Sequence, residues 1–261
     1  MITAYIHSFQ SEWLKRKRSL AAWIVLIGGF FTPAIIILVR IVYSSKLPAM
    51  YAAPNFWFKH WDNAWESMSI FFLPLGVILA TSLIAQLEYK NNCWKQLHTT
   101  PLSLTTIFFS KLGVIVVMMF QFFLLFNIGI YLSALVPYLI VGGVHYPDAP
   151  IPFAIFIREN FLFFIDCLPV IAIQYLVSLK YKNFLVPVGL GICCWIAAIA
   201  VLSWKYGYLL PYTYTMFNYL KSHGGGRAVI PSVNIHVMAV GYFVVVTIVS
   251  YILYITKKEK G

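Results

Sequence analysis

One carboxylate of this chain lies inside a long apolar stretch, where an ionised group is chemically unusual. Asp166 stands in FLFFIDCLPVIAIQY, roughly 13 Å of helix beyond Ile157, where the stretch begins. Burying the charged form in hydrocarbon is costly, so this side chain should face protein or a water-filled cavity, form a pair, or be protonated. Pro169 follows closely and frees a backbone carbonyl, which favours a kink. Asp166 is therefore the first candidate for a functional side chain.

Three neutral polar side chains lie in similarly apolar surroundings: Gln121, Asn127 and Gln174. Such groups either hydrogen-bond neighbouring helices or, together with Asp166, line a path for a substrate. The sequence leaves both interpretations open. An intramembrane enzyme would need an acid and a base that converge at one depth, and the sequence shows no such pair.

The cysteines and histidines predict neither a disulfide framework nor a metal site. Three of the four cysteines lie in apolar stretches and Cys93 in a polar insert, so all four are predicted to be reduced packing residues. The six histidines lack the spacing of metal ligands. Four of the histidines could share one face of the protein with Asp62 and Asp148, and we interpret them as ordinary solvated loop residues. They are His60, His145, His223 and His236.

Nucleotide hydrolysis by the usual route is excluded by the motifs. No GxxxxGK[ST] sequence occurs, and the glycines before Arg227 lack both the Lys-Ser/Thr ending and a preceding buried strand. There is also no serine elbow and no HExxH helix. The sequence predicts no catalytic residue and no cofactor bound by this chain.

The elements that position these residues are predicted to be membrane-spanning helices. Of all residues 61% are hydrophobic and only 10% are charged, against about 25% charged in soluble domains. Runs of roughly 20 apolar residues can cross ~30 Å of hydrocarbon, and lipid tolerates no unpaired backbone groups there. We predict an all-α polytopic membrane protein with a single domain over residues 1–261. Its six crossings are expected at about 19–42, 68–87, 105–137, 157–179, 184–203 and 235–255.

The third of these runs is too long for one simple crossing. We expect it to start in the cytoplasmic interface and tilt, or to end as an extracellular helix.

The basic residues predict the orientation of the chain. Lys and Arg favour cytoplasmic loops, and most of the 19 fall near the N-terminus, around the insert at 88–104, between the fourth and fifth crossings, and in the tail. Both termini are predicted to be cytoplasmic, in the inner (cytoplasmic) membrane of a bacterium. The net charge of +11 is attributed to this topology and to contact with anionic membrane lipids. A nucleic-acid partner is not predicted, because the basic residues are divided among loops.

The first eighteen residues are predicted to form an amphipathic helix in the inner interface, since apolar residues recur at helical spacing and polar ones occupy the other face. A frayed, positively charged start is the alternative. No small-residue cleavage site follows, so a cleavable signal is not predicted. The apolar residues of this helix are Ile2, Tyr5, Ile6, Phe9 and Trp13.

A polar, helix-capable insert, EYKNNCWKQLHTTPLSL, separates the second and third crossings and suits docking of a soluble partner. The order of these elements resembles that of the permease subunits of type-2 ABC transporters. It is a basic start (SEWLKRKRS, Ser11 to Ser19), a crossing, an outer loop, a second crossing and this insert. The chain is particularly similar to lantibiotic-immunity and bacitracin-resistance-like permeases. The residues of the insert and its flank that carry the resemblance are Glu88, Tyr89, Lys90, Asn91, Asn92, Trp94, Lys95, Leu97, Pro101 and Lys111.

The resemblance implies a separately encoded ATPase subunit, which binds ATP and Mg²⁺ and receives a coupling helix from the insert. Asn91 to Leu97 could form about two turns with Trp94 as an aromatic anchor, and Pro101 would end the helix. In the alternative, the insert is an interfacial loop whose Trp94 only anchors in the headgroups. The implied docking residues are Glu88, Asn91, Asn92, Trp94, Lys95, Leu97 and Pro101.

The resemblance also implies a permease half that pairs with a second copy or a similar subunit. The assembly would export an amphipathic substrate, such as a peptide antibiotic, a drug or a lipid-like molecule. The family typically has short re-entrant or extracellular helices before the last crossing, and Tyr212 to Lys221, within the aromatic outer segment 204–234, fits one. The alternative function is a membrane sensor or assembly scaffold that binds a soluble partner through the same insert.

Overall fold

The computed structural model describes residues 2–17, 19–90, 103–223 and 228–256, which are almost entirely helical and contain no strand. Five segments among them are long and apolar enough to cross a membrane, and a sixth apolar helix, α9 (Leu185–Ala200), is shorter. The prediction of an all-α polytopic membrane protein is confirmed. The five long segments are α2 (Leu20–Val42), Phe56–Leu87 of α4 to α5, α7 (Leu104–Ile140), α8 (Phe153–Lys180) and α11 (Ile235–Thr256).

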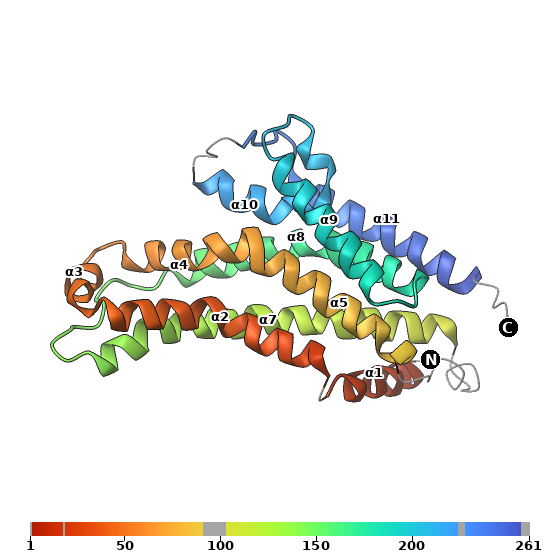
Figure 1. Cartoon of the computed structure of the whole chain (residues 1–261), viewed down its shortest axis with the longest axis horizontal. Helices are drawn as coiled ribbons and strands as arrows, with labels where there is room; N and C mark the ends of the chain where they lie inside the picture. Colours follow the sequence, from red (N-terminus) through yellow and green to blue (C-terminus); the bar gives the residue numbers. More distant parts are fainter. Residues whose placement is uncertain (1, 18, 91–102, 224–227, 257–261) are drawn as a thin grey trace.

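The long helices run alongside one another and give the bundle two ends (Figure 1). The α1 end holds α1 (Ile2–Arg16), the last turn of α5, the first turn of α7 and the last turn of α11. The α3 end holds η1 (Ser44–Lys46), α3 (Leu47–Tyr51), the start of α4 and the end of α7. Between α9 and α11 the chain forms η3 (Gly207–Leu209), η4 (Pro211–Thr213) and α10 (Tyr214–Ser222), of which η4 and α10 pack against α8.

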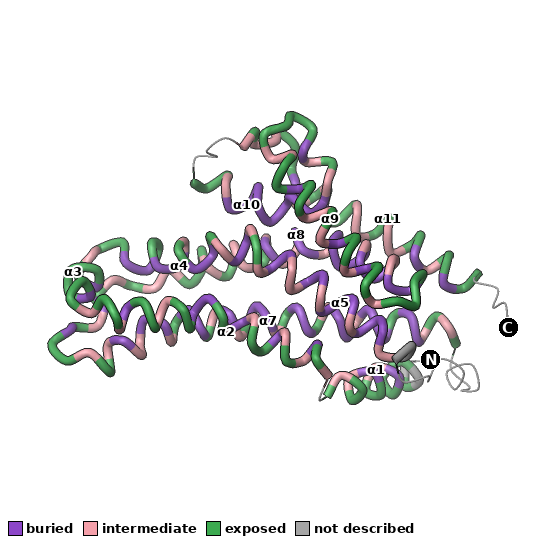
Figure 2. The backbone as a smooth tube through the Cα atoms, viewed as in Figure 1, coloured by how far each residue is buried: buried purple, intermediate pink, exposed green. Residues whose placement is uncertain are grey.

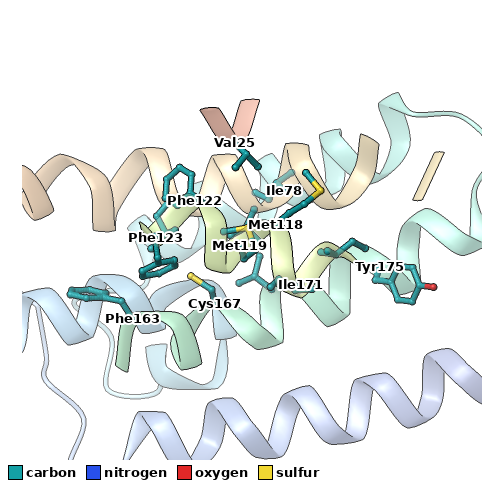
Figure 3. Close-up of a cluster of buried hydrophobic side chains, with 14 of the residues drawn as sticks. Val25, Ile78, Met118, Met119, Phe122, Phe123, Phe163, Cys167, Ile171 and Tyr175 are labelled. Carbon is teal, nitrogen blue, oxygen red and sulfur yellow. The ribbon is translucent and has the colours of Figure 1, made fainter. Parts of the chain in front are cut away.

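The core lies where α5, α7 and α8 meet (Figure 3). Trp65, at the end of α4, stacks on Phe163 of α8 with ring centroids 4.0 Å apart. Phe126 of α7 meets the same indole edge to face at 5.1 Å. In contrast, α2 and α11 are exposed over most of their apolar surface (Figure 2). Such surfaces are suited to contact with lipid.

Small residues bring α2 and α7 into close contact. A Cβ atom added to Gly129 of α7 would lie 2.7 Å from Cγ of Pro33 on α2. One added to Gly29 of α2 would lie 3.0 Å from Cβ of Leu125. Membrane helices commonly associate through such residues, because their backbones can then approach closely.

The second crossing begins earlier than the apolar run that we predicted at 68–87. Helix starts at Phe56 with α4 (Phe56–Ser67), continues through one π-helical turn, η2 (Met68–Phe72), and then α5 (Leu73–Lys90). The α4 part is amphipathic: Trp61 and Trp65 are buried, whereas Lys59 and Glu66 are exposed. A search for unbroken apolar runs misses such a helix.

The third crossing is one helix of 37 residues, α7, which makes it about 55 Å long. Ser103 caps its first turn by accepting a hydrogen bond from the backbone N–H of Thr106 (3.2 Å). Its length exceeds the ~30 Å hydrocarbon thickness, so a large part of α7 must lie outside the hydrocarbon or be strongly tilted.

Candidate functional site

The α1 end holds the ends of the two helices that flank the predicted docking insert. Helix α5 ends at Lys90 and α7 begins at Leu104, and both of these helix ends lie near α1 (Figure 1). Glu88 belongs to the last turn of α5. The other predicted docking residues lie outside the described residues: Asn91, Asn92, Trp94, Lys95, Leu97 and Pro101.

A polar clamp fixes α1 to α7. The guanidinium of Arg16 lies 3.6 Å from the ring centroid of Trp13, and it donates a hydrogen bond to Oε1 of Gln121 on α7. Burial lowers the pKa of Arg16 below its usual value. A Cβ atom added to Gly113 of α7 would lie 3.0 Å from the hydroxyl of Tyr5, so the Tyr5 side chain packs directly against the backbone of α7. Gln121 therefore connects two helices at the α1 end.

The packed face of α1 differs from the one that the hydrophobic pattern predicts. Ser8 and Glu12 are buried together with part of the aromatic face, and Glu12 pairs with Lys15. Ile6 and Leu14 are exposed instead. Polar contacts, such as that of Arg16 with Gln121, help to set which face of α1 packs, and a pattern based on hydrophobicity alone does not include them.

Asp166 is fully buried and forms a hydrogen bond between two crossings. Nδ1 of His236, in the first turn of α11, donates to Oδ1 of Asp166 on α8 at 2.8 Å. Within the part of the chain that the structure describes, the second carboxylate oxygen makes no hydrogen bond that meets the geometric criteria, although the Asn218 side chain on α10 interacts with this carboxyl group. The predicted kink position, Pro169, lies within the continuous helix α8. Asp166 thus meets α11 at that helix's first turn.

We expect Asp166→Leu to reduce stability, because it removes an interhelical hydrogen bond and leaves His236 without its acceptor. The loss should be about 1 kcal/mol, the usual size of polar contacts between membrane helices. Asp166→Asn should retain most of the stability, since the amide oxygen still accepts from His236. Thermal unfolding of the purified chain in detergent measures both. His236→Leu should add little to Asp166→Leu, whereas fully additive losses would show that the two residues do not share one interaction.

Gln174 occupies a second fully buried position on α8. It donates to the hydroxyl of Tyr212 at 2.7 Å and accepts from Ser82 at 3.4 Å. A Cβ atom added to Gly191 would lie 2.3 Å from Nε2 of Gln174, so the backbone of α9 passes directly beside this amide. The side chain of Gln174 thereby connects α5, α8, α9 and η4.

Asn127 pairs with Asn160 of α8, a residue that the sequence analysis did not select. Nδ2 of Asn127 donates to Oδ1 of Asn160 at 2.8 Å, and Nδ2 of Asn160 donates to Oδ1 of Asn127 at 2.9 Å. The pair lies in a groove of about 490 Å³ between α4, α7 and α8. We call it the α4–α7–α8 groove. Its walls include Trp57, Trp61, Phe120, Tyr131, Phe156 and Phe161.

The four residues predicted for a substrate path therefore lie in different places. Asp166 and Gln174 share the face of α8 that is turned toward η4, α10 and α11. Asn127 lies in the α4–α7–α8 groove, and Gln121 lies against α1. The structure does not bring all four to one cavity. Each makes an interhelical hydrogen bond, as the first of the two interpretations of these residues predicts.

Three of the histidines that we interpreted as solvated loop residues have specific partners. His60 is buried, accepts a hydrogen bond from Arg40 at 3.0 Å, and donates from Nε2 to the carbonyl of Ile130 at 2.9 Å. His223 lies 3.2 Å from Asp62, and His236 binds Asp166. The solvated interpretation is wrong for His60, because α4 turns this side chain toward α2 and α7.

The outer segment is tied to α4 through the end of α10. Nε2 of His223 approaches Oδ2 of Asp62, and its ring stacks on Tyr219 with centroids 4.1 Å apart. Burial, with the carboxylates of Glu66 and Asp62, raises the pKa of Tyr219 to about 12. The helix α10 covers most of Tyr212 to Lys221, the part of this segment that fitted a short helix.

Comparison with known protein families identifies a match over most of the chain. The model for ABC-2 family transporter proteins matches residues 8–198, from α1 through most of α9. No curated protein matches the chain. The matched region is well over half of the sequence and contains the crossings that flank the insert. The chain belongs to the ABC-2 family of transporter proteins.

Proposed function

We propose that this chain is the membrane subunit of an ATP-driven exporter whose ATP is bound, with Mg²⁺, and hydrolysed by a separately encoded subunit. The observation that carries the proposal is the family match over residues 8–198. Members of the family are membrane subunits that generally lack an ATPase site of their own. The sequence agrees, because it has no GxxxxGK[ST] motif. A second permease copy or a similar subunit would complete the transport unit.

In this proposal the ATPase docks at the α1 end, on the insert 88–104. The insert joins α5 to α7, and α7 is held by the Arg16 clamp to α1. A displacement of the insert would therefore act on two crossings and on α1 together. This arrangement supports a docking function, since coupling requires a surface that is connected mechanically to the crossings.

We propose that the α1 end faces the cytoplasm, because its loops hold most of the basic residues. A cysteine introduced at Ser232, between α10 and α11, should react with a membrane-impermeant maleimide in intact cells. The native cysteines are first replaced by serine. A cysteine introduced at Ser103, near the end of the insert, should react only after permeabilisation. The reverse pattern would contradict this orientation.

The proposed substrate is an amphipathic molecule, with peptide antibiotics first and drug-like or lipid-like molecules next. Asp166 and Gln174 stay candidates for its path, because they are polar groups within a crossing that borders the outer segment. A path function for Asp166 predicts that Asp166→Asn lowers transport while stability is retained. Unchanged transport across pH would leave only the structural function of this residue.

The test of the proposed function uses the chain co-expressed with the ATPase encoded next to it. The pair is purified and reconstituted into proteoliposomes, and ATP hydrolysis is measured with and without a lantibiotic or bacitracin. We expect the ATPase to co-purify and the substrate to stimulate hydrolysis and ATP-dependent movement. If the two subunits co-purify but no candidate substrate is moved or stimulates hydrolysis, the result favours the sensor or scaffold function.

A further inference from the structure

The tie between α10 and α4 is made by both ring nitrogens of one histidine. His223 directly follows the last turn of α10, and α10 lies next to the second crossing (Figure 1). Nδ1 of His223 lies 2.8 Å from the backbone carbonyl oxygen of Tyr219, and Nε2 lies 3.2 Å from Oδ2 of Asp62 on α4. Each ring nitrogen therefore faces an oxygen atom, one on its own helix and one on α4.

The chemistry of these two oxygens decides which protonation state of the ring fits. A backbone carbonyl can only accept a hydrogen bond, so Nδ1 has to donate to Tyr219. An ionised carboxylate also only accepts, so Nε2 has to donate to Asp62. Neutral imidazole carries one N–H group, whereas imidazolium carries two. Only the protonated ring satisfies both contacts, because in either neutral form a nitrogen lone pair faces an oxygen lone pair.

The neighbouring hydroxyl does not replace the second proton. Oγ of Ser222 lies 3.2 Å from Nδ1, but it donates its hydrogen to the same Tyr219 carbonyl at 2.9 Å. While that bond is made, the hydroxyl can offer Nδ1 only a lone pair. The imidazole also stacks on the ring of Tyr219, with centroids 4.1 Å apart, which holds the plane of the imidazole. Both nitrogens therefore need their own hydrogen atom in this arrangement.

The charged groups of α4 near this histidine are mainly acidic. Asp62 and Glu66, one helical turn apart, both act on Tyr219, the residue on which the imidazole stacks. The described lysines of α4 and α10, Lys59 and Lys221, are exposed. Two carboxylates beside the ring favour its cationic form.

The other elements packed against α10 place their titratable groups elsewhere. The turn η2 (MSIFF) has no titratable side chain. The Asp166–His236 pair of α8 and α11 reaches α10 at Asn218, more than one turn before His223. The hydroxyl of Tyr212 in η4 accepts from Gln174. Proton binding at the end of α10 is therefore a matter for His223 and the carboxylates of α4.

From this geometry we propose that His223 is a proton-binding site that controls the attachment of the outer segment to α4. With the proton, the ring donates to both oxygens and the tie closes. Without it, one contact becomes repulsive and the tie opens. The closed tie takes up the proton, so it is complete at acidic pH and weakens as the pH rises through about 5 to 8, where histidine changes charge.

Solvent reaches this site without any opening of the bundle. The side chains of His223 and Asp62 are 28% and 40% exposed, so protons exchange directly with the surrounding water. Exposure also screens the ion pair, which limits the size of the effect. The proposal requires neither an ATPase nor a transported substrate.

The test is hydrogen–deuterium exchange of the full chain in nanodiscs at about pH 5.5 and about pH 8, on either side of the histidine range. Exchange times are scaled for the intrinsic pH dependence of amide exchange, and the amides of α2 serve as the internal reference. We expect the amides of α10 to be about threefold better protected at the lower pH, which is the size typical of a partly exposed ion pair.

Two variants should remove this pH dependence for different reasons. His223→Gln has no group that titrates in this range. Asp62→Asn replaces a carboxylate by an amide, which can donate to a neutral Nε2 or accept from a protonated one. Protection of α10 should therefore be equal at both pH values in each variant.

Two matched controls should retain the pH dependence. His145→Gln removes an exposed histidine from the loop between α7 and α8. Glu66→Gln removes an exposed carboxylate one turn along α4 from Asp62, and this carboxylate makes no ion pair with His223. Together they separate the His223–Asp62 contact from a general effect of histidine or of acidic charge.

Equal protection of α10 at both pH values in the unmodified chain would overturn the proposal. A pH dependence that survives in both His223→Gln and Asp62→Asn would overturn it as well, because another group, such as His236, would then be responsible. Since exchange is measured on this chain alone, these results and those of the transport experiment are independent of each other.

Discussion

Replacing Glu88, Trp94 and Lys95 together by alanine is expected to abolish co-purification of the ATPase and all ATP-dependent transport. A separately encoded ATPase can drive this chain only through a surface that transmits force at one membrane face. Aromatic anchors dominate such interfaces, and truncation of one costs about 2 kcal/mol or more, so Trp94→Ala alone should weaken binding roughly thirtyfold. Co-purification and substrate-stimulated ATPase activity measure the effect.

The same variants should insert into the membrane normally, because the three positions fall between the described crossings Phe56–Leu87 and Leu104–Ile140. Trp204→Ala is the matched control: Trp204 is an exposed tryptophan that follows α9, in the outer segment. It should leave ATPase binding unchanged. If the triple variant retains both ATPase binding and coupled activity, the insert is not the docking surface and the coupling proposal is wrong.

Gly129→Leu is expected to prevent formation of the folded bundle. Even its Cβ atom would lie 2.7 Å from Cγ and 3.0 Å from Cβ of Pro33, and 3.2 Å from the ring of Phe30. The rigid proline ring cannot move aside, so α2 would have to separate from α7. Overpacking of this kind typically costs about 1–3 kcal/mol, and leucine here requires separation of the helices along their contact. Size-exclusion chromatography after heating in detergent measures the loss of folded protein.

Gly241→Leu is the matched control for this substitution. Gly241 lies in the crossing α11, and a Cβ atom there would meet no other atom within 4 Å. This variant introduces a leucine into a crossing without a clash against another helix, so the stability of the folded bundle should change little. Equal losses in both variants would show that the α2–α7 contact is not the cause.

The crossings could be predicted because hydrocarbon requires long apolar helices, and the runs at 19–42 and 235–255 nearly coincide with α2 and α11. The start of the second crossing could not be found in this way. In α4 the buried residues alternate with Lys59, Asp62 and Glu66 at helical spacing, so no apolar run marks it. A search for the helical period from Phe56 onward would have found that signal.

The candidate polar residues were recognisable, but their partners were not. Asp166, Asn127 and Gln121 each stand out because a polar group in an apolar run is costly. His236, Asn160 and Arg16 come from other helices, and no local spacing connects them to these residues. Pairing depends on which helix faces meet, and that information is tertiary. The docking residues from Asn91 to Pro101 lie outside the described residues, so docking stays a prediction.

The length of α7 gives the bundle the properties of a lever. The helix is continuous for about 55 Å, and α1 holds it at Gln121, ~26 Å from its first residue, Leu104. A rotation of about 5° about the Leu104 end would move the far tip by about 5 Å, roughly the width of an acyl chain. Asn127 lies about two thirds of the way along and would move by ~3 Å. A small motion at the base could thus break or form a hydrogen bond at the groove, without any change in the helix itself.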